Sequence, residues 1–328
     1  MKAWILPKLG SIDALNFAEV PEPTAGDGEV VIRVKLAALN PADRYLAEGM
    51  YPARPAMPHI LGRDGLGVVD SVGPGVTNWN VGDTAVLIRS EVGVNRPGAF
   101  AEKVAVPAES LASVPEGWTD EQASCAALVY ITAWQALTQF GELPKGSLVL
   151  ITGASGGVGI ASLHVARSLG LVPIALSRGT SKIDALKENG AELVLDPADP
   201  KWTKAIKTQF GDRRVDLAID NIGGDLFNDV LRTLGENGRV SCVGRLAGPV
   251  PQFNTADLFF RRLQIRGVSI GSYTAAESAA VFADLVARLN AVGIRPVVDR
   301  VFGFRELPAA FERLHAGPLG KIILRVGQ

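Results

Sequence analysis

Three glycines in the middle of the chain, Gly153, Gly156 and Gly159, have the spacing G-x-x-G-x-x-G. They follow the apolar run 148–152, which is typical of a buried parallel strand, and they precede a stretch typical of a helix. Glycines in such a turn let the backbone approach a phosphate closely, and a helix start offers unpaired N–H groups. The spacing is a variant of the fingerprint that binds nicotinamide dinucleotides. We therefore expect a pyrophosphate to be bound by the backbone of four turn residues, Ser155, Gly156, Gly157 and Val158.

The next predicted strand, 171–176, ends at side chains that bear on the choice between the two nicotinamide cofactors. Folds that bind NAD place an acidic residue there, where it accepts hydrogen bonds from the ribose 2′-hydroxyl. This chain has Ser177 and Arg178 instead, with Lys182 a few residues later. Arg178 can bind a 2′-phosphate with two hydrogen bonds, and Ser177 can donate another. These residues predict NADPH; the alternative is that Arg178 and Lys182 are only solvated surface charges.

Strands and helices alternate from residue 147 onward, which is the pattern of a doubly wound α/β sheet. Ligands bind such sheets at the carboxyl ends of the strands, where the glycine turn and Ser177 stand. We expect six parallel strands, at 148–152, 171–176, 193–195, 215–220, 240–244 and 263–270.

The first third of the chain has a different character, with short β-branched runs separated by glycine and proline. Runs such as 30–36 and 65–72 predict a barrel-like, mainly antiparallel β domain. The last predicted strand, 321–326, is expected to return to this domain. We therefore predict a catalytic domain over 1–123, a dinucleotide-binding domain over 124–270 and a return to the catalytic domain over 271–328.

Composition excludes several other functions for this 328-residue chain. Its formal net charge is −1, so no global field favours nucleic acid or an anionic membrane. No apolar stretch reaches the ~20 residues that a membrane span needs, and the apolar N-terminal segment is too short for a signal peptide, so we expect a cytoplasmic protein. The two cysteines, Cys125 and Cys242, stand far apart in apolar surroundings, which favours packing roles over a disulfide or a metal site.

Several different short motifs follow one another along the chain: Leu39-Asn40-Pro41-Ala42-Asp43, Gly49-Met50-Tyr51-Pro52, Leu61-Gly62-Arg63-Asp64-Gly65, Val72-Gly73-Pro74-Gly75, Val81-Gly82-Asp83, Gly98-Ala99-Phe100-Ala101-Glu102, Ala154-Ser155-Gly156-Gly157-Val158-Gly159, Asp220-Asn221-Ile222-Gly223-Gly224 and Gly320-Lys321-Ile322. In their order and spacing they resemble the medium-chain dehydrogenase/reductase superfamily, on its zinc-independent quinone oxidoreductase and enoyl reductase branch. The resemblance implies a GroES-like catalytic domain and a Rossmann domain that binds NADPH.

The resemblance also bears on zinc. Zinc-dependent members of the superfamily carry a cysteine ligand just before the position of Asp43, and Gly-His-Glu at 62–64. This chain has Ala42 and Arg63 at the ligand positions, and neither side chain can ligate zinc. We expect no metal site. Because an unpaired buried guanidinium is costly, we also expect Arg63 to pair with Asp43 or Asp64.

By the same resemblance, three residues are assigned to the reacting centre. Asn40 would orient groups in the nicotinamide cleft, Tyr51 would protonate or orient the reduced substrate, and Thr132 would contact the nicotinamide. Each has a plainer interpretation: Asn40 caps a turn, Tyr51 packs among loop prolines, and Thr132 caps a buried helix.

Further cofactor contacts are implied at loops after the later strands and near the end of the chain: Asn221, Gly244, Arg245, Ile270, Gly271 and Lys321. One departure from the relatives concerns the adenosine. Many NADPH-binding relatives have a tyrosine shortly after the third strand, where this chain has Asp196-Pro197-Ala198-Asp199. Packing around the adenine is therefore expected to differ.

Together these features predict an NADPH-dependent, zinc-independent oxidoreductase that transfers hydride to a quinone or an α,β-unsaturated carbonyl. One alternative is a trans-2-enoyl-thioester reductase, in which Arg54, Arg89 and Arg96 could bind the phosphates of a carrier. Another is a non-catalytic NADPH-binding protein. We expect a small-molecule electron acceptor as the partner, and a homodimer joined through the edge strand at 263–270.

Overall fold

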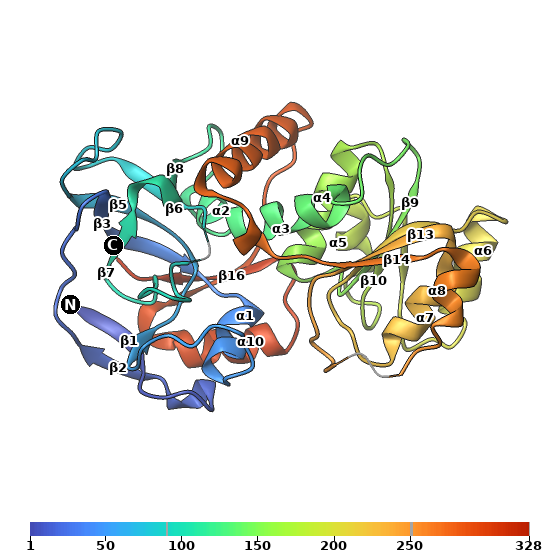
Figure 1. The fold of residues 1–328 in the computed structure, drawn as a ribbon, viewed down its shortest axis with the longest axis horizontal. Coiled ribbons are helices and arrows are strands. Elements are labelled where there is room, and N and C mark those ends of the chain that lie inside the picture. Colours follow the sequence, from blue (N-terminus) through green and yellow to red (C-terminus); the bar gives the residue numbers. More distant parts are fainter. Residues whose placement is uncertain (90, 250–251, 328) are drawn as a thin grey trace. The chain divides into compact units, whose positions relative to one another are not determined.

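The computed structural model describes residues 1–89, 91–249 and 252–327, and the chain divides into two compact units (Figure 1). Unit 1 comprises Met1–Val129, Ile270–Asn290 and Arg295–Gln328, and unit 2 comprises Tyr130–Ser269 and Ala291–Ile294. The domain bounds expected from the sequence remain a prediction, because a compact unit is not by itself an independently folding domain.

Unit 1 consists mainly of antiparallel strands. They are β1 (Lys2–Leu6), β2 (Asn16–Glu19), β3 (Glu29–Ala38), β4 (His59–Ile60), β5 (Asp64–Val72), β6 (Thr84–Leu87), β7 (Lys103–Pro107), β8 (Leu111–Ser113), β15 (Val298–Gly303) and β16 (Lys321–Arg325). One sheet has the order β2-β1-β4, and a seven-stranded sheet runs β15-β16-β3-β5-β6-β8 with β7 paired to β3. Because β16 pairs with β3, the predicted return of the last strand to the first part of the chain is confirmed.

The strand pairings of the described residues form open sheets, so the barrel expected from the sequence is not closed by a continuous ladder. The three-stranded sheet is joined to the segment near residue 100 by single contacts. The Trp4 N–H donates to the Phe100 carbonyl oxygen at 2.9 Å, and Ala3 forms an isolated bridge with Ala101. The strands of the three-stranded sheet are short, and they end before a continuous ladder to the seven-stranded sheet can form. The mainly antiparallel character of the unit is as predicted.

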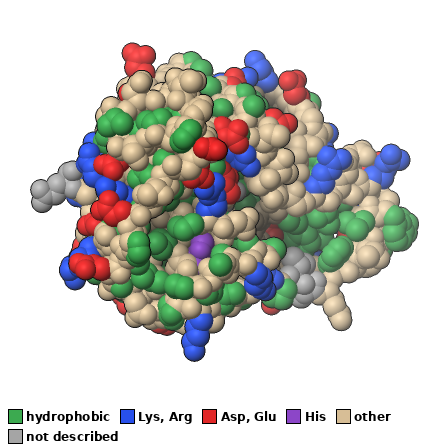
Figure 2. Space-filling view, turned by 60° about the vertical axis from the view of Figure 1, so that its left-hand side comes forward, with side chains coloured by type: hydrophobic (Ala, Val, Ile, Leu, Met, Phe, Trp, Pro, Cys, Tyr) green, Lys and Arg blue, Asp and Glu red, His purple; other side chains and the backbone are tan. Residues whose placement is uncertain are grey.

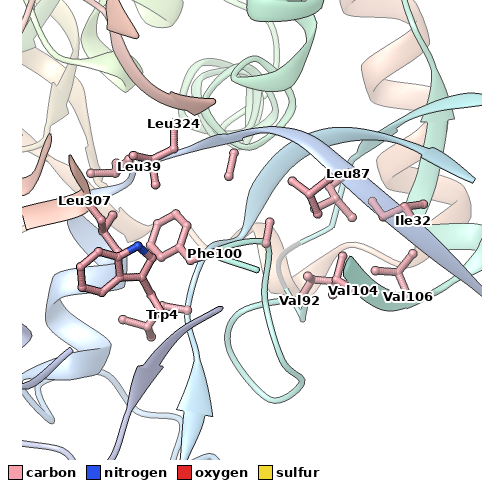
Figure 3. Close-up of a cluster of buried hydrophobic side chains, with 14 of the residues drawn as sticks. Trp4, Ile32, Leu39, Leu87, Val92, Phe100, Val104, Val106, Leu307 and Leu324 are labelled. Atoms are coloured by element: carbon pink, nitrogen blue, oxygen red, sulfur yellow. The ribbon is translucent and has the colours of Figure 1, made fainter. Parts of the chain in front are cut away.

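The core of unit 1 draws apolar side chains from distant parts of the chain (Figure 3). Trp4 lies beside Phe100 and Leu307 there, close to Leu39 and Leu324. The helices that cover this unit are α1 (Pro41–Ala47), α2 (Asp120–Ser124), α9 (Ala275–Ala291) and α10 (Leu307–His315). Helix α2 begins at the N-cap residue Thr119, whose hydroxyl accepts a hydrogen bond from the Gln122 N–H at 3.2 Å.

Unit 2 contains the parallel sheet that the sequence predicted. Its strands are β9 (Leu148–Thr152), β10 (Val172–Leu176), β11 (Leu193–Leu195), β12 (Val215–Asp220), β13 (Leu234–Cys242) and β14 (Gln264–Gly267). Their order in the sheet is β11-β10-β9-β12-β13-β14, and every described pair is parallel. The turns after β10, β9, β12 and β13 therefore lie side by side, in that order, along the edge of the sheet where the strands end.

Helices cover both faces of this sheet. They are α3 (Ala127–Thr138), which begins in unit 1, and α4 (Gly157–Ser168), α5 (Ile183–Glu188), α6 (Trp202–Phe210), α7 (Leu226–Thr233) and α8 (Ala256–Arg261). All five residues of the central strand β9 are buried, whichever face they point to. Leu148 and Leu150 share a cluster with Trp202 of α6 and Phe227 of α7. A strand buried on both sides explains the continuous apolar run in the sequence.

Candidate functional site

The glycine turn joins β9 to α4 as the sequence predicted. Gly153 has a positive φ of +59°, which favours glycine, and the Gly156 N–H donates to the Gly153 carbonyl oxygen at 3.1 Å. A Cβ at Gly159 would lie 2.5 Å from the carbonyl oxygens of Gly153 and Ala154, so this position admits no side chain. Residues 155–158 are half-buried at the start of α4. The turn therefore presents helix N-terminal N–H groups at the strand edge, where an anion can bind them.

A buried hydrogen-bond network that the sequence analysis missed clamps this turn to the end of β12. The Thr152 hydroxyl donates to Asp220 Oδ1 at 2.8 Å, and the Asn221 N–H donates to the Thr152 hydroxyl oxygen at 2.9 Å. The Asn221 side-chain amide donates to the Thr152 carbonyl oxygen at 2.8 Å, and the Gly223 N–H donates to Asp220 Oδ2 at 3.1 Å. The sequence signal for this network is the Asp-Asn-x-Gly-Gly motif, whose Asp220 is the last residue of β12. It places Asn221 on a fixed frame beside the glycine turn.

The residues expected to choose the cofactor follow β10. Ser177 is buried and its N–H donates to the Leu195 carbonyl oxygen at 3.0 Å, whereas Arg178 is exposed. Lys182 reaches back to the glycine turn, where its ammonium donates to the Ser155 hydroxyl at 3.2 Å. Lys182, which is predicted to bind the 2′-phosphate, thus contacts Ser155, which is predicted to bind the pyrophosphate.

Asp196 takes part in the same loop, at the position where the sequence departs from its relatives. Its Oδ2 accepts a hydrogen bond from the Gly179 N–H at 2.9 Å, and its Oδ1 accepts one from the Ala198 N–H at 2.9 Å. Asp196 therefore fixes the backbone next to Arg178 and leaves the guanidinium exposed.

In unit 1, Asn40 lies between β3 and α1 at the centre of a buried polar cluster. Lys321 Nζ donates to Asn40 Oδ1 at 2.7 Å and to Asp64 Oδ2 at 2.9 Å. The Asn40 amide donates to the same Asp64 oxygen at 2.9 Å. Asn40 does occupy the N-cap position of α1, yet its side chain is held by Lys321 and Asp64. All three residues are buried.

Tyr51 is connected to this cluster through two further buried residues. Asp43 Oδ2 accepts a hydrogen bond from the Asn40 N–H at 2.8 Å, and Asp43 Oδ1 lies 3.4 Å from Arg63 Nε. Arg63 lies over the Tyr51 ring, 4.8 Å from its centroid, and donates to the Tyr51 hydroxyl at 3.4 Å. The expectation that Arg63 has an acidic partner is confirmed, and that partner is Asp43.

The charges in this buried cluster balance, since Asp43 and Asp64 are matched by Arg63 and Lys321. Burial raises the pKa of the Asp43 carboxyl, and the guanidinium of Arg63 opposes that rise. Lys321 donates to Asp64 Oδ2, the Asn40 N–H donates to Asp43 Oδ2, and Arg63 lies beside Asp43 Oδ1. Within the described ranges, no three His, Cys, Asp or Glu side chains are grouped so that they could hold a metal ion. At the two positions where zinc-dependent relatives carry ligands, this chain has Ala42 and Arg63, whose side chains cannot bind zinc.

The two cysteines are packing residues, as expected. Cys125 is buried in a cluster with Leu36, Ala38 and Ile323, and Cys242 packs against the core of unit 2. Both are free thiols. Burial raises the pKa of Cys125 to about 12 and that of Cys242 to about 11, so neither supplies a thiolate near neutral pH.

The remaining predicted residues fall into both units. Thr132 is largely buried on α3 in unit 2, while Ile270 and Gly271 form the start of a short 3₁₀ helix, Ile270–Ser272, in unit 1. Gly244 follows β13, where a Cβ would lie 2.7 Å from the Asn221 carbonyl oxygen, and Arg245 beside it is exposed. The structure thus brings together Asn40, Lys321 and Tyr51 in one unit and the residues predicted to bind phosphate in the other. The roles assigned to all of them remain predictions.

The surface carries no extended field of one sign on the face that Figure 2 shows, where acidic and basic side chains are interspersed. Among the helices in the described part of the chain, none is long and apolar enough to cross a membrane.

Two family models match the chain. One, described as a zinc-binding dehydrogenase, covers residues 157–288, and one described as an alcohol dehydrogenase GroES-like domain covers residues 26–116. The second match lies within unit 1 and confirms the GroES-like character expected there. The first covers much of the parallel sheet of unit 2.

Known proteins match over nearly the whole chain. Quinone oxidoreductase from Rattus norvegicus is 30% identical over 99% of this chain and 97% of its own length. The synaptic vesicle membrane protein VAT-1 homolog from Homo sapiens is 30% identical over 100% of this chain and 87% of its own. The structure of a mycobacterial protein complexed with NADPH is 28% identical, with a TM-score of 0.90 over 99% of this chain and 100% of that one. The chain belongs to the medium-chain dehydrogenase/reductase superfamily of oxidoreductases, on its quinone oxidoreductase branch.

Proposed function

We propose that this protein is an NADPH-dependent, zinc-independent reductase of quinones or α,β-unsaturated carbonyls. The observation that carries the proposal is the buried cluster of Asn40, Asp43, Arg63, Asp64 and Lys321, whose charges balance without a metal. Alcohol oxidation in zinc-dependent relatives uses the metal as a Lewis acid. A site built from two ion pairs suits acceptors that take up hydride without a Lewis acid.

NADPH is the cofactor that the residues of unit 2 fit. The glycine turn offers N–H groups to a pyrophosphate, and Ser177, Arg178 and Lys182 offer donors to a 2′-phosphate. The NADPH complex of the mycobacterial relative supports the same assignment. When bound, NADPH supplies the hydride. Asn221, Gly244 and Arg245 would line the same strand edge, and Thr132, Ile270 and Gly271 would complete the contacts to the cofactor.

The roles of the unit 1 residues follow from their contacts. Asn40 is held on both sides by Lys321 and Asp64, so its amide is fixed in one orientation and can position a bound group. Tyr51 is half-buried, with its ring against the unit 1 core and its hydroxyl beside Arg63. It is the residue we assign to proton donation when the acceptor is an enone.

Three arginines bear on the alternative of an enoyl-thioester reductase, which would need free positive charge for the phosphates of a carrier. Arg96 forms an ion pair with Glu29, and Arg89 forms one with Glu91 at 3.1 Å. Arg54 donates to the Tyr51 carbonyl oxygen and to that of Gly49. Since all three are already engaged, we favour the smaller acceptors.

The test compares acceptors side by side with purified protein and NADPH. We expect turnover of a 1,4-quinone that is indifferent to Tyr51→Phe, and turnover of an enone that this substitution lowers by about 10²-fold or more. Efficient, saturable turnover of a crotonyl thioester would favour the thioester reductase instead. Tight NADPH binding without turnover of any acceptor would favour a non-catalytic role.

We also propose that the protein forms a homodimer through the edge of the unit 2 sheet. β14 is the last strand in the sheet order, and on the neighbouring α8 the side chains of Phe259 and Phe260 are 64% and 79% exposed. Light scattering should show a dimer, and Phe260→Ser should weaken it. A monomer at all concentrations would rule the assembly out.

A further inference from the structure

Arg63 is a buried guanidinium with an incomplete set of partners. Its side chain is 3% exposed, and among the described residues neither Nε nor Nη2 has a hydrogen-bond partner. Nε lies 3.4 Å from Asp43 Oδ1, and Nη1 donates to the Tyr51 hydroxyl at 3.4 Å. Burying a charge is costly unless a counter-ion and hydrogen bonds offset the loss of its hydration.

Among the neighbouring charges, Lys321 Nζ donates to both Asp64 and Asn40. Asp43 Oδ2 accepts from the Asn40 N–H, while Asp43 Oδ1 lies 3.4 Å from Arg63 Nε and, like it, has no hydrogen-bond partner in the described part of the chain. Arg63 is thus the cation of the cluster that faces Tyr51, both over its ring and at its hydroxyl.

We propose that Arg63 is a positioning residue for Tyr51. It fixes the ring by stacking on it, and its positive charge stabilises the negative charge that the Tyr51 oxygen carries after giving up its proton. Asp43 holds the guanidinium in place from the other side. This inference rests on the proposed function, and specifically on reduction of an enone.

The chemistry in which Arg63 takes part balances as follows. The acceptor C=C gains a hydride at its β-carbon, and NADPH is oxidised to NADP⁺. The electron pair of the C=C becomes an enolate, which takes a proton from the Tyr51 hydroxyl. The O–H bond of Tyr51 breaks, and its oxygen recovers a proton from water. A quinone yields a stabilised phenolate that can take its proton directly from water, so its reduction does not need Tyr51 or Arg63.

The experiment measures kcat for an enone and for a 1,4-quinone in the same variants, and uses their ratio as the readout. The variants are Tyr51→Phe, Arg63→Lys, Arg63→Gln combined with Asp43→Asn, and the combination of these two substitutions with Tyr51→Phe. Pairing Arg63→Gln with Asp43→Asn keeps the buried cluster neutral, so that the protein is not left with an unpaired Asp43. NADPH affinity from fluorescence and the thermal midpoint are recorded for each variant.

We expect the neutral Arg63/Asp43 variant to lower the enone-to-quinone ratio of kcat by about 10- to 100-fold. Arg63→Lys keeps the positive charge and should lower this ratio less. In the Tyr51→Phe background the same two substitutions should change the ratio by less than about 3-fold, because residues that act together are not additive. Affinity for NADPH should not follow the ratio.

A matched control is the ion pair between Arg313 and Asp299 in the same unit, which lies at 2.6 Å. Arg313→Gln combined with Asp299→Asn should lower the thermal midpoint and leave the ratio as it is.

Equal losses with both acceptors in the Arg63 variants would mean that Arg63 is only structural, and would overturn the proposal. So would an unchanged ratio, or a wild-type protein that reduces quinones but no enone. Failure of the wild type with every acceptor would instead reject the proposed function.

Discussion

Lys321 Nζ lies 2.9 Å from Asp64 Oδ2, although 257 positions separate the two residues in the sequence. Asp64 begins β5 and Lys321 begins β16, and each of these strands pairs with β3. The pairing of the last strand therefore completes the cluster around Asn40, which follows β3.

Removal of the Lys321 charge is predicted to be strongly destabilising. Lys321→Met leaves the buried Asp64 carboxylate without its cation, at a cost of roughly 3–5 kcal/mol. Adding Asp64→Asn to Lys321→Met should recover much of this loss, because the charge imbalance is removed. Urea unfolding of the three proteins measures the effect. A single variant as stable as the wild type would show that the pair is not needed.

Two glycines of the turn, Gly156 and Gly159, should respond differently to a methyl group. In Gly159→Ala the new Cβ would lie 2.5 Å from two carbonyl oxygens, and the overpacking should cost about 1–3 kcal/mol. In Gly156→Ala the nearest atom is 3.5 Å away and φ is −76°, so stability should change little.

NADPH affinity should show the opposite order. Gly156→Ala should weaken NADPH binding more than Gly159→Ala does, since Gly156 lies where the phosphate is expected to approach the backbone. Thermal unfolding and a fluorescence titration with NADPH separate the two effects. Equal destabilisation by both alanines would contradict the close contact at Gly159.

Arg178 is predicted to set the preference for NADPH over NADH. Arg178→Glu replaces a donor to the 2′-phosphate by a repelling carboxylate, and should weaken NADPH binding by about 10- to 100-fold while affecting NADH little. Lys187→Glu is the control, because Lys187 is an exposed cation on α5 away from the strand end. If both charge reversals weaken NADPH binding equally, the overall charge of unit 2 sets the affinity and Arg178 has no specific role.

Acid should destabilise unit 2 through His164. Burial lowers the pKa of His164 to about 4 from an ordinary value of 6.5, and the ring lies between the Tyr130 hydroxyl at 2.7 Å and Asn189 Oδ1 at 2.8 Å. Since the unfolded chain takes up the proton first, this contribution is complete above about pH 6.5 and declines as the pH falls toward 4. At about pH 5 the loss amounts to about 2 kcal/mol.

His164→Gln keeps a polar group that cannot be protonated, so the fall in unfolding free energy between about pH 7 and pH 5 should be smaller in this variant. Other groups titrate in both proteins, and the difference between the two proteins isolates His164. Parallel curves would contradict the assignment.

Local sequence patterns were sufficient for most elements of unit 2. The turn from β9 to α4 is encoded by the apolar run before Gly153 and the glycines after it, and β10, β11 and β12 each show an apolar run, whereas β13 begins at Leu234 rather than at 240 and β14 is polar. Contacts between distant segments could not be read in this way. The sequence left Asp43 and Asp64 as equal partners for Arg63; the fold selects Asp43 because Lys321 and Asn40 occupy Asp64.

Two other features were hidden for the same reason. The clamp between Thr152 and Asp220 joins residues 68 positions apart, which become neighbours only when β9 and β12 pair. The dimer contact was expected at the edge strand 263–270, yet β14 there is polar in sequence, and the exposed aromatic side chains near it are Phe259 and Phe260 of α8.

The most direct test of metal-independent hydride transfer is turnover of a 1,4-quinone by purified protein after exhaustive treatment with a chelator, with NADPH and NADH compared in parallel. We expect undiminished oxidation of NADPH and a clear preference for it over NADH. Activity that disappears with the chelator and returns with zinc would contradict the central claim that the buried ion pairs serve where relatives use a metal.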